Sequence, residues 1–206
     1  MKRSLVPVFG LLIVLAAVGC ADPAKDKPQA EVKEAVAEPA APADAQQFVL
    51  TDESSIGFVG SKVTGSHDGG FNTFEGEILL AGGDPTKSSV NITIDTTSIW
   101  SDNDRLTDHL KSPDFFEVET YPTATFTSTE IVQESDAYRI TGNLTLHGIT
   151  KSVSFPAGIT IEEGRVTATA EFAIKRFEYD MKFEGKADDL IRDDVVIKLN
   201  VVAAPA

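Results

Sequence analysis

Apolar and polar residues alternate along much of this chain, and this period of two is the strongest constraint on its fold. Val90, Ile92 and Ile94, for example, are separated by polar residues. The same alternation recurs in the segments 138–146, 166–175 and 195–201. Successive side chains of a strand point to opposite faces, so these segments are predicted to be antiparallel strands with one apolar face. Further strands are predicted at 55–63, 71–80, 123–132 and 152–161.

About eight strands with a consistent apolar face fit either a β-sandwich or a closed barrel. Closure removes exposed strand edges, and the interior of an eight-stranded barrel just holds side chains or one small ligand. Several residues on the predicted inner face are small, namely Gly60, Gly142, Ala168 and Ala170. They favour an open lumen, unless they face a bulge or a large ring in a filled core.

The segment 104–126 interrupts the alternation. It contains four aromatic residues and two prolines, namely Phe115, Phe116, Tyr121, Phe126, Pro113 and Pro122. Neither a long helix nor a central strand tolerates that spacing of prolines, and large rings in irregular chain need a surface to pack against. The segment 104–122 is therefore predicted to be a lid over the open end of the β-structure.

One short helix is predicted at 103–111, within this lid. Asp102 or Asn103 can cap its first turn, and Leu106 and Leu110 lie four residues apart on one face. A helix of this length is marginal on its own, so we expect it to dock on the rest of the domain.

The start of the chain is typical of an exported protein. The apolar run Leu5–Val18 follows two basic residues and is too short to span a bilayer, so residues 1–19 are predicted to be a signal peptide. The run Leu15–Cys20 resembles a bacterial lipoprotein signal, which implies that Cys20 carries lipid after cleavage. An ordinary signal peptide with an incidental cysteine is the alternative.

Residues 20–46 are rich in Ala, Pro, Glu, Lys and Asp and contain no aromatic residue. Such a segment cannot bury enough apolar area to offset the entropy of ordering it. We therefore predict that it is a disordered tether between the lipid and a single domain at 47–206. Ala21, rather than Asp, follows the cysteine and resembles an outer-membrane sorting signal, so the expected location is the periplasmic side of the envelope, anchored to the outer membrane.

Composition excludes several classes of function. The 206 residues include 32 acidic and 18 basic side chains, for a net charge of −14. This balance disfavours binding to nucleic acid and direct attraction to anionic lipid. Cys20 is the only cysteine, so the chain has no intramolecular disulfide and no cysteine-based metal site.

Three blocks of the domain carry a resemblance to a known family. They are Lys62–Ile78, His109–Phe116 together with Tyr121–Phe126, and Gly142–Lys151. In this order and spacing they resemble the YceI-like family, lipocalin-like bacterial proteins described as polyisoprenoid-binding, from about residue 47 to 204. The resemblance implies an antiparallel eight-stranded barrel with a helix near its mouth. It also implies a long apolar molecule in the lumen, such as a polyprenyl chain, a quinone tail or a fatty amide.

One position departs from the family pattern of an arginine, an aromatic residue three positions later, a glycine and a hydrophobic residue. Arg176, Tyr179 and Met181 fit this pattern, but Asp180 stands where glycine is expected. If the position needs a positive φ, aspartate tolerates it better than most residues do. If it needs close approach of another backbone, the pocket wall differs here.

These observations together predict a non-enzymatic lipid carrier or store. The predicted ligand-binding residues are Phe58, Phe74, Trp100, Leu106, Leu110, Phe115, Phe116, Phe126, Phe172, Arg176 and Tyr179. Arg176 is expected either to meet a polar or anionic head group or to form a surface ion pair or an aromatic stack. The expected partners are a hydrophobic small molecule and, through Cys20, a membrane. No cofactor is expected apart from a bound lipid such as a polyprenyl or quinone compound.

Two alternatives remain open. The first is a structural or stress-protective envelope lipoprotein whose barrel is filled by side chains. The second is a metal-dependent enzyme built on the three histidines, His67, His109 and His147, since imidazole is a common zinc ligand. No HxH or HxxxH spacing joins any two of them, and we expect backbone capping or contact with a ligand head group instead.

Overall fold

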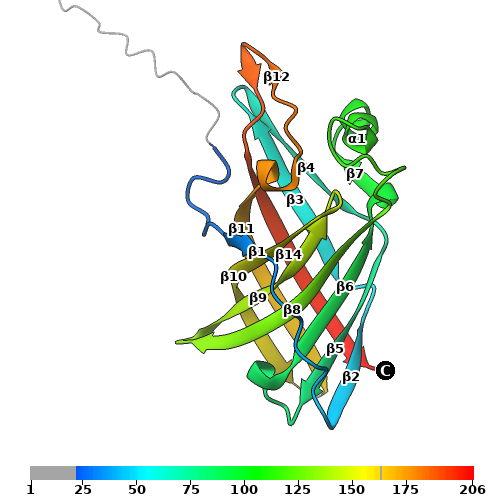
Figure 1. The fold of residues 1–206 in the computed structure, drawn as a ribbon, viewed down its shortest axis with the longest axis vertical. Helices are drawn as coiled ribbons and strands as arrows, with labels where there is room; N and C mark the ends of the chain where they lie inside the picture. Colours follow the sequence, from blue (N-terminus) through cyan, green and yellow to red (C-terminus); the bar gives the residue numbers. More distant parts are fainter. Residues whose placement is uncertain (1–21, 163) are drawn as a thin grey trace, which may run out of the picture.

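The computed structural model in Figure 1 describes residues 22–162 and 164–206. The expected signal peptide, 1–19, and Cys20 lie outside these residues. Within the described part of the chain, no helix is both long and apolar enough to cross a membrane.

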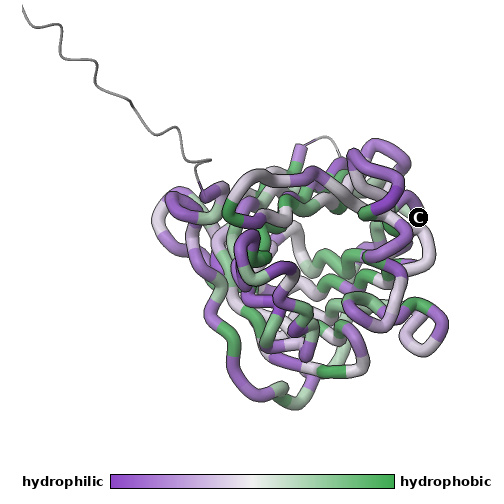
Figure 2. The backbone as a smooth tube through the Cα atoms, turned by 90° about the horizontal axis from the view of Figure 1, so that it is seen from above, coloured by the Kyte–Doolittle hydropathy of each residue, from purple (hydrophilic) through white to green (hydrophobic). Residues whose placement is uncertain are grey.

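Eight antiparallel strands close into a barrel. They are β2 (Ala45–Leu50), β5 (Phe74–Ala81), β6 (Ser89–Asp95), β8 (Thr123–Glu134), β9 (Ala137–Leu146), β10 (Ile149–Glu162), β11 (Arg165–Lys175) and β14 (Asp194–Pro205). Each strand pairs with the next in this order, and β14 pairs back with β2, where Ala203 lies opposite Leu50. Seen along its long axis, the backbone forms a ring (Figure 2). The predicted eight-stranded antiparallel barrel is confirmed.

Shorter elements extend the wall at one end, which we call the mouth. The strand β3 (Ser55–Lys62) pairs with β14, β4 (Gly65–Phe71) pairs with β3, and β7 (Ile99–Ser101) pairs with β4. The helix α1 (Asp104–Lys111) and the small hairpin of β12 (Gly185–Lys186) and β13 (Asp189–Leu190) lie at the same end (Figure 1). Three 3₁₀ turns complete the fold, namely η1 (Pro85–Lys87), η2 (Thr96–Ser98) and η3 (Arg176–Tyr179).

The membership of the barrel differs from the sequence prediction in two places. The segment predicted at 55–63 forms β3, which extends the wall at the mouth, while β2 completes the ring and was not predicted. The segment predicted at 71–80 is divided between β4 and β5, because Asn72 and Thr73 leave the ladder. Both of their amides donate instead to Ser98, to its carbonyl at 3.3 Å and to its hydroxyl at 3.0 Å.

The predicted helix is confirmed as α1, with Asn103 as its cap. The Asn103 side chain accepts a hydrogen bond of 3.1 Å from the amide of Leu106, which satisfies a donor that an α-helix leaves unpaired at its start. Leu110 is buried, and it packs in a cluster with Phe58, Ile99 and Phe115. The helix therefore docks on the mouth through the face that carries Leu106 and Leu110.

The N-terminal segment differs from the predicted disordered tether. The strand β1 (Glu31–Glu34) pairs with residues 151–154 of β10. Just before it, the Ala30 amide donates to Ala173 of β11 at 2.8 Å, and the Ala173 amide donates to Pro28 at 2.8 Å. Because β10 and β11 pair with each other only over 158–162 and 165–169, the segment 28–34 lies between them where they diverge. Backbone hydrogen bonds to β10 and β11 order this segment, and amino-acid composition gives no information about such bonds.

Candidate functional site

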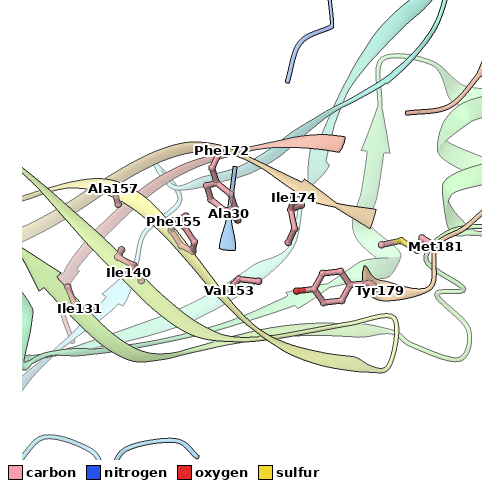
Figure 3. Close-up of a cluster of buried hydrophobic side chains, with 10 residues drawn as sticks. All are labelled: Ala30, Ile131, Ile140, Val153, Phe155, Ala157, Phe172, Ile174, Tyr179 and Met181. Atoms are coloured by element: carbon pink, nitrogen blue, oxygen red, sulfur yellow. The ribbon is translucent and has the colours of Figure 1, made fainter. Parts of the chain in front are cut away.

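The barrel encloses a cavity of about 440 Å³. Apolar side chains on alternate positions of the strands form most of its wall, among them Phe155 and Phe172, whose rings stack with centroids 4.2 Å apart. Figure 3 shows part of this wall, where labelled side chains from β9, β10 and β11 lie between the strands. The cavity volume lies in the range of small-molecule sites. The lumen can therefore hold an apolar chain.

Most of the predicted ligand-binding residues line this cavity. They are Phe58, Leu106, Leu110, Phe115, Phe116, Phe126, Phe172, Arg176 and Tyr179. They come from the inner faces of the strands, from α1 and the loop that follows it, and from η3. Their contact with a ligand stays a prediction, but the fold brings them to one surface.

Two predicted residues, Phe74 and Trp100, do not line the lumen. Both border a second groove, together with Leu50. Trp100 belongs to β7 and is 40% exposed, and its ring packs on Gly70, where an added Cβ would lie 3.1 Å from the indole nitrogen. Phe74 is the first residue of β5, at the edge of that groove. Phe74 packs against the buried cluster of Ile78 and Ile92 at the end of its strand, whereas for Trp100 the sequence does not show which side of the wall the ring faces.

The small residues of the inner face have different roles. An added Cβ at Gly60 meets no atom within 4 Å, and Ala168 and Ala170 line the cavity. At Gly142, in contrast, an added Cβ would lie 2.4 Å from the ring of Phe126. Gly142 therefore makes room for an aromatic side chain, whereas the other three leave space open.

The predicted site residues do not include several residues that line the lumen. Three of these could have been predicted from the alternation of residue types in the strand at 152–161. Val153, Phe155 and Ala157 share one face of β10 and all line the cavity. Met181 also lines it, although it follows η3 in irregular chain, where no period identifies an inner face.

The predicted lid closes one side of the mouth. The ring of Phe116 lies edge-on to Phe71 with centroids 5.7 Å apart, and Phe115 contacts Phe183 at 5.6 Å. The backbone holds this arrangement, since the Phe116 amide donates to Leu110 at 3.0 Å. Tyr121 belongs to the same segment but packs on His147 instead, with centroids 4.7 Å apart.

Arg176 is buried at the inner end of the mouth and holds three backbone segments together. Its Nε donates to the carbonyl of Arg192 at 3.0 Å, one terminal nitrogen donates to Ile191 at 3.2 Å, and the other donates to Met181. The guanidinium carbon also lies 4.6 Å from the centroid of the Phe177 ring. Of the roles considered for this residue, the structure shows the aromatic stack, and within residues 22–162 and 164–206 Arg176 forms no ion pair. Contact with a ligand head group stays a prediction. Burial lowers the pKa of Arg176, against the opposing charges of Asp193 and Glu184.

Residues 49–203 match the YceI-like domain. The chain belongs to the YceI-like family. Among its relatives, the UPF0312 protein of Pectobacterium atrosepticum is 44% identical over 43% of this chain and 46% of its own length. Protein YceI of Escherichia coli O157:H7 is 37% identical over 55% of this chain and 63% of its own. The chain thus spans about half to two thirds of the length of these curated relatives.

Solved structures show the same fold. BcnA of Burkholderia cenocepacia is 27% identical and superposes with a TM-score of 0.68, over 74% of this chain and 97% of that one. A polyisoprenoid binding domain from Saccharophagus degradans is 19% identical and superposes with a TM-score of 0.65, over 79% of this chain and 100% of that one.

The departure of this YceI-like chain at Asp180 has a local explanation. Asp180 ends η3 in the left-handed conformation, with φ of 60° and ψ of 12°, where glycine is unstrained and aspartate is better tolerated than most residues. Its side chain is exposed and pairs with Lys182, which lowers the pKa of the carboxyl group. The position therefore needs a positive φ, and Asp180 does not line the lumen.

The three histidines lie at separate places and each has its own carboxylate neighbour. His67 contacts Asp102 at 2.7 Å, which lowers the pKa of that carboxyl group. His109 contacts Asp114 at 2.7 Å. Among residues 22–162 and 164–206, no group of three or more histidine, cysteine or acidic side chains is arranged to hold a metal ion.

His147 has a structural role in the turn between β9 and β10. It has a φ of 50° and is followed by Gly148 with a φ of 72°, and two such residues in succession suit the tight turn of a β-hairpin. Its Nδ1 lies 3.0 Å from the carbonyl of Tyr179. His147 therefore helps to fix η3 against the hairpin.

Proposed function

We propose that this YceI-like protein binds or carries a long apolar amphiphile in its barrel lumen and is not an enzyme. The observation that carries the proposal is the cavity of about 440 Å³, whose wall is formed mainly by rings and branched aliphatic side chains. An apolar molecule gains roughly 25 cal/mol for each Å² of surface that it removes from water. The polyisoprenoid binding of the Saccharophagus degradans domain, which has the same fold, supports a polyprenyl or similar chain as the cargo.

A structural role with a filled barrel is less well supported. Gly60 faces open space, and Ala168 and Ala170 line the cavity where large side chains would be needed to fill it. A filled core would also place further rings at these positions, since protein interiors pack closely. An enzyme based on the histidines is also less well supported, because the three side chains do not meet at one site. His67 contacts Asp102, His109 contacts Asp114, and His147 contacts the carbonyl of Tyr179.

A single substitution in the lumen tests the proposal. Replacing Ala170 by tryptophan inserts a large ring into the cavity, so we expect loss of co-purifying amphiphile in native mass spectrometry of protein from its own host. Glu171→Trp is the matched control, because Glu171 is the next residue of β11 and is exposed. It should retain the bound mass of the wild type. The proposal is contradicted if the wild type carries no co-purifying amphiphile and its melting temperature does not rise when prenyl lipids are added.

We further propose that the protein is exported and anchored by lipid on Cys20, with the mouth near the membrane. Asp22 forms an ion pair of 3.3 Å with Arg192, whose backbone lies 2.8 Å from Ser61 at the mouth end of β3. Ala24 is buried against Val59 and Val196 on the outside of the barrel. Two residues of chain reach at most about 7 Å, so a lipid on Cys20 would begin close to the mouth. This orientation favours passage of cargo between bilayer and lumen.

Removal of the cysteine tests the anchor. Cys20→Ala in the full chain should move the protein from the membrane to the soluble envelope fraction, because its attachment then depends on no acyl chain. Ala21→Asp is the control, which should stay membrane-bound but shift from the outer to the inner membrane. Membrane retention of Cys20→Ala to the wild-type extent would argue against lipidation.

A further inference from the structure

The barrel wall contains a slit where two neighbouring strands diverge. The strand β10 pairs with β11 only over 158–162 and 165–169, so residues 149–157 of β10 and 170–175 of β11 share no ladder. Side chains from both of these stretches line the cavity, among them Val153, Phe155, Phe172 and Ile174. Without a further segment in the slit, the lumen would open sideways.

The N-terminal segment 22–36, which we call the strap, fills this slit. Its strand β1 lies beside β10 and β11 in Figure 1 and pairs with β10, and the Ala30 amide donates to the carbonyl of Ala173 in β11 at 2.8 Å. Ala30 is buried and Val32 is partly buried, and both pack on the apolar cluster inside the barrel. The strap therefore supplies a piece of the lumen wall, although it precedes the matched family domain at 49–203.

The strap is held less firmly than the strands around it. Its strand β1 pairs with β10 over four residues, whereas β10 pairs with β9 from Ile149 to Ala157. The side chains that the strap buries most deeply, Ala24 and Ala30, are small. They remove little apolar surface from water, so the hydrophobic contribution to docking of the strap is small.

Ion pairs at the surface supply further contacts of the strap. Lys27 Nζ lies 2.7 Å from a carboxylate oxygen of Glu171 in β11, and Lys151 Nζ of β10 lies 2.6 Å from one of Glu34. The Glu34 side chain is 89% exposed. Ion pairs in such exposed positions contribute little to stability, so they position the strap without fixing it permanently.

The strap ends at a point where it is fixed to β9. The Asn143 side chain accepts from the Val36 amide at 3.1 Å and donates to the Val36 carbonyl at 2.7 Å. Residues 37–41, which follow, are exposed and belong to no helix or strand. The strap can therefore swing about Val36 while the domain from β2 onward stays folded.

We propose that the strap is a gate in the barrel wall, and that the apolar chain of the cargo enters and leaves the lumen sideways through the slit between β10 and β11. This inference rests on the proposed function and adds the route of the cargo. The slit begins at the mouth, since Lys175 ends β11 there and η3 follows it. The mouth itself is held by buried contacts, because Arg176 donates to three backbone carbonyls. Release of the strap would let an extended chain slide in without threading lengthwise through the mouth.

A reversible disulfide between the strap and β10 tests the gate. Lys33 and Ser152 lie opposite each other in the β1–β10 ladder, and residues so paired have Cβ atoms about 4.5–5.5 Å apart, which a disulfide can bridge with a small movement. Lys33→Cys with Ser152→Cys, in the full chain carrying Cys20→Ala, leaves the introduced pair as the only thiols.

Stopped-flow fluorescence of cis-parinaric acid, a long polyene fatty acid, measures uptake and release by this variant. We expect both rates to fall about tenfold or more on oxidation and to recover on reduction. The affinity should stay the same, because a gate slows entry and exit equally.

Thr145→Cys with Thr150→Cys is the matched control. These residues join β10 to β9, its permanent neighbour, and their hydroxyl oxygens lie 2.9 Å apart. An oxidised bridge at this place leaves the slit as it is, so uptake and release should keep the wild-type rates.

Lys27→Glu tests the gate in the opposite direction and needs no disulfide. It places a second carboxylate beside Glu171 and loosens the strap, so we expect uptake and release to be about threefold faster. Lys87→Glu is the control, because it makes the same change of charge in η1, where its partner Asp84 precedes it by three residues. It should change neither rate.

The outcomes separate this inference from the proposed function. Equal rates in the oxidised and reduced protein overturn the gate and leave the lumen as the binding site, as do wild-type rates in Lys27→Glu. A loss of affinity on oxidation without slower rates also overturns it, because the strap would then act only as part of the binding wall. If the wild type does not bind cis-parinaric acid, the proposed function fails and the inference fails with it.

Discussion

Arg176→Lys is expected to lower the free energy of unfolding by about 3 to 5 kcal/mol. The guanidinium of Arg176 reaches the carbonyls of Met181, Ile191 and Arg192, which lie on both sides of the β12–β13 hairpin. A lysine carries its donors on one nitrogen and cannot span these carbonyls. The variant therefore leaves buried carbonyls unpaired and a buried charge without compensation. Urea denaturation of the ligand-free protein measures the effect.

Lys175→Met is the matched control for Arg176→Lys. Lys175 is the preceding residue and is exposed, with carboxylate oxygens of Asp193 and Asp194 at 3.8 and 3.6 Å. Surface ion pairs of this kind contribute up to about 1 kcal/mol, so this variant should unfold near the wild type. If Arg176→Lys unfolds within about 1 kcal/mol of Lys175→Met, the three carbonyl contacts do not stabilise the mouth.

Much of the fold follows from the alternation of residue types. The parity of Phe172 and Ile174 on β11, or of Val90 and Ile92 on β6, identifies inward-facing positions from residue type alone. The same reasoning places most of the lumen wall, because in a barrel the core face and the cavity face are one surface. The helix α1 was predicted from the cap at Asn103 and from the spacing of Leu106 and Leu110, which are features of the local sequence.

The parts that sequence alone did not predict depend on contacts between distant segments. The partners of Arg176 are backbone carbonyls 5 to 16 residues away. Every residue has such a carbonyl, so the sequence does not show which ones Arg176 contacts. Trp100 lies on the outside because β7 pairs with β4 at the edge of the sheet. The order of the N-terminal segment likewise comes from pairing with β10, which is more than a hundred residues away in the chain.

Ala30→Asp is expected to lower the free energy of unfolding by about 2 to 4 kcal/mol. Ala30 is 6% exposed and packs in the same buried cluster as Val153, Phe155 and Phe172 (Figure 3). A carboxylate at this position would be buried among apolar side chains without a partner, or it would pull the segment 28–34 out of the wall. The second outcome exposes backbone groups of β10 and β11 to water.

Hydrogen exchange shows whether the carboxylate stays buried or the segment 28–34 leaves the wall. Ala37→Asp is the control, since Ala37 lies just beyond β1 and is exposed. If the segment leaves the wall, amide exchange in 151–154 and at Ala173 should accelerate in Ala30→Asp, while exchange in the β11–β14 ladder stays slow. Ala37→Asp should change neither stability nor exchange. Equal stability of the two variants would mean that the segment 28–34 is not part of the barrel wall. A loss confined to Ala30→Asp would make the barrel depend on a strand that precedes the 49–203 family domain.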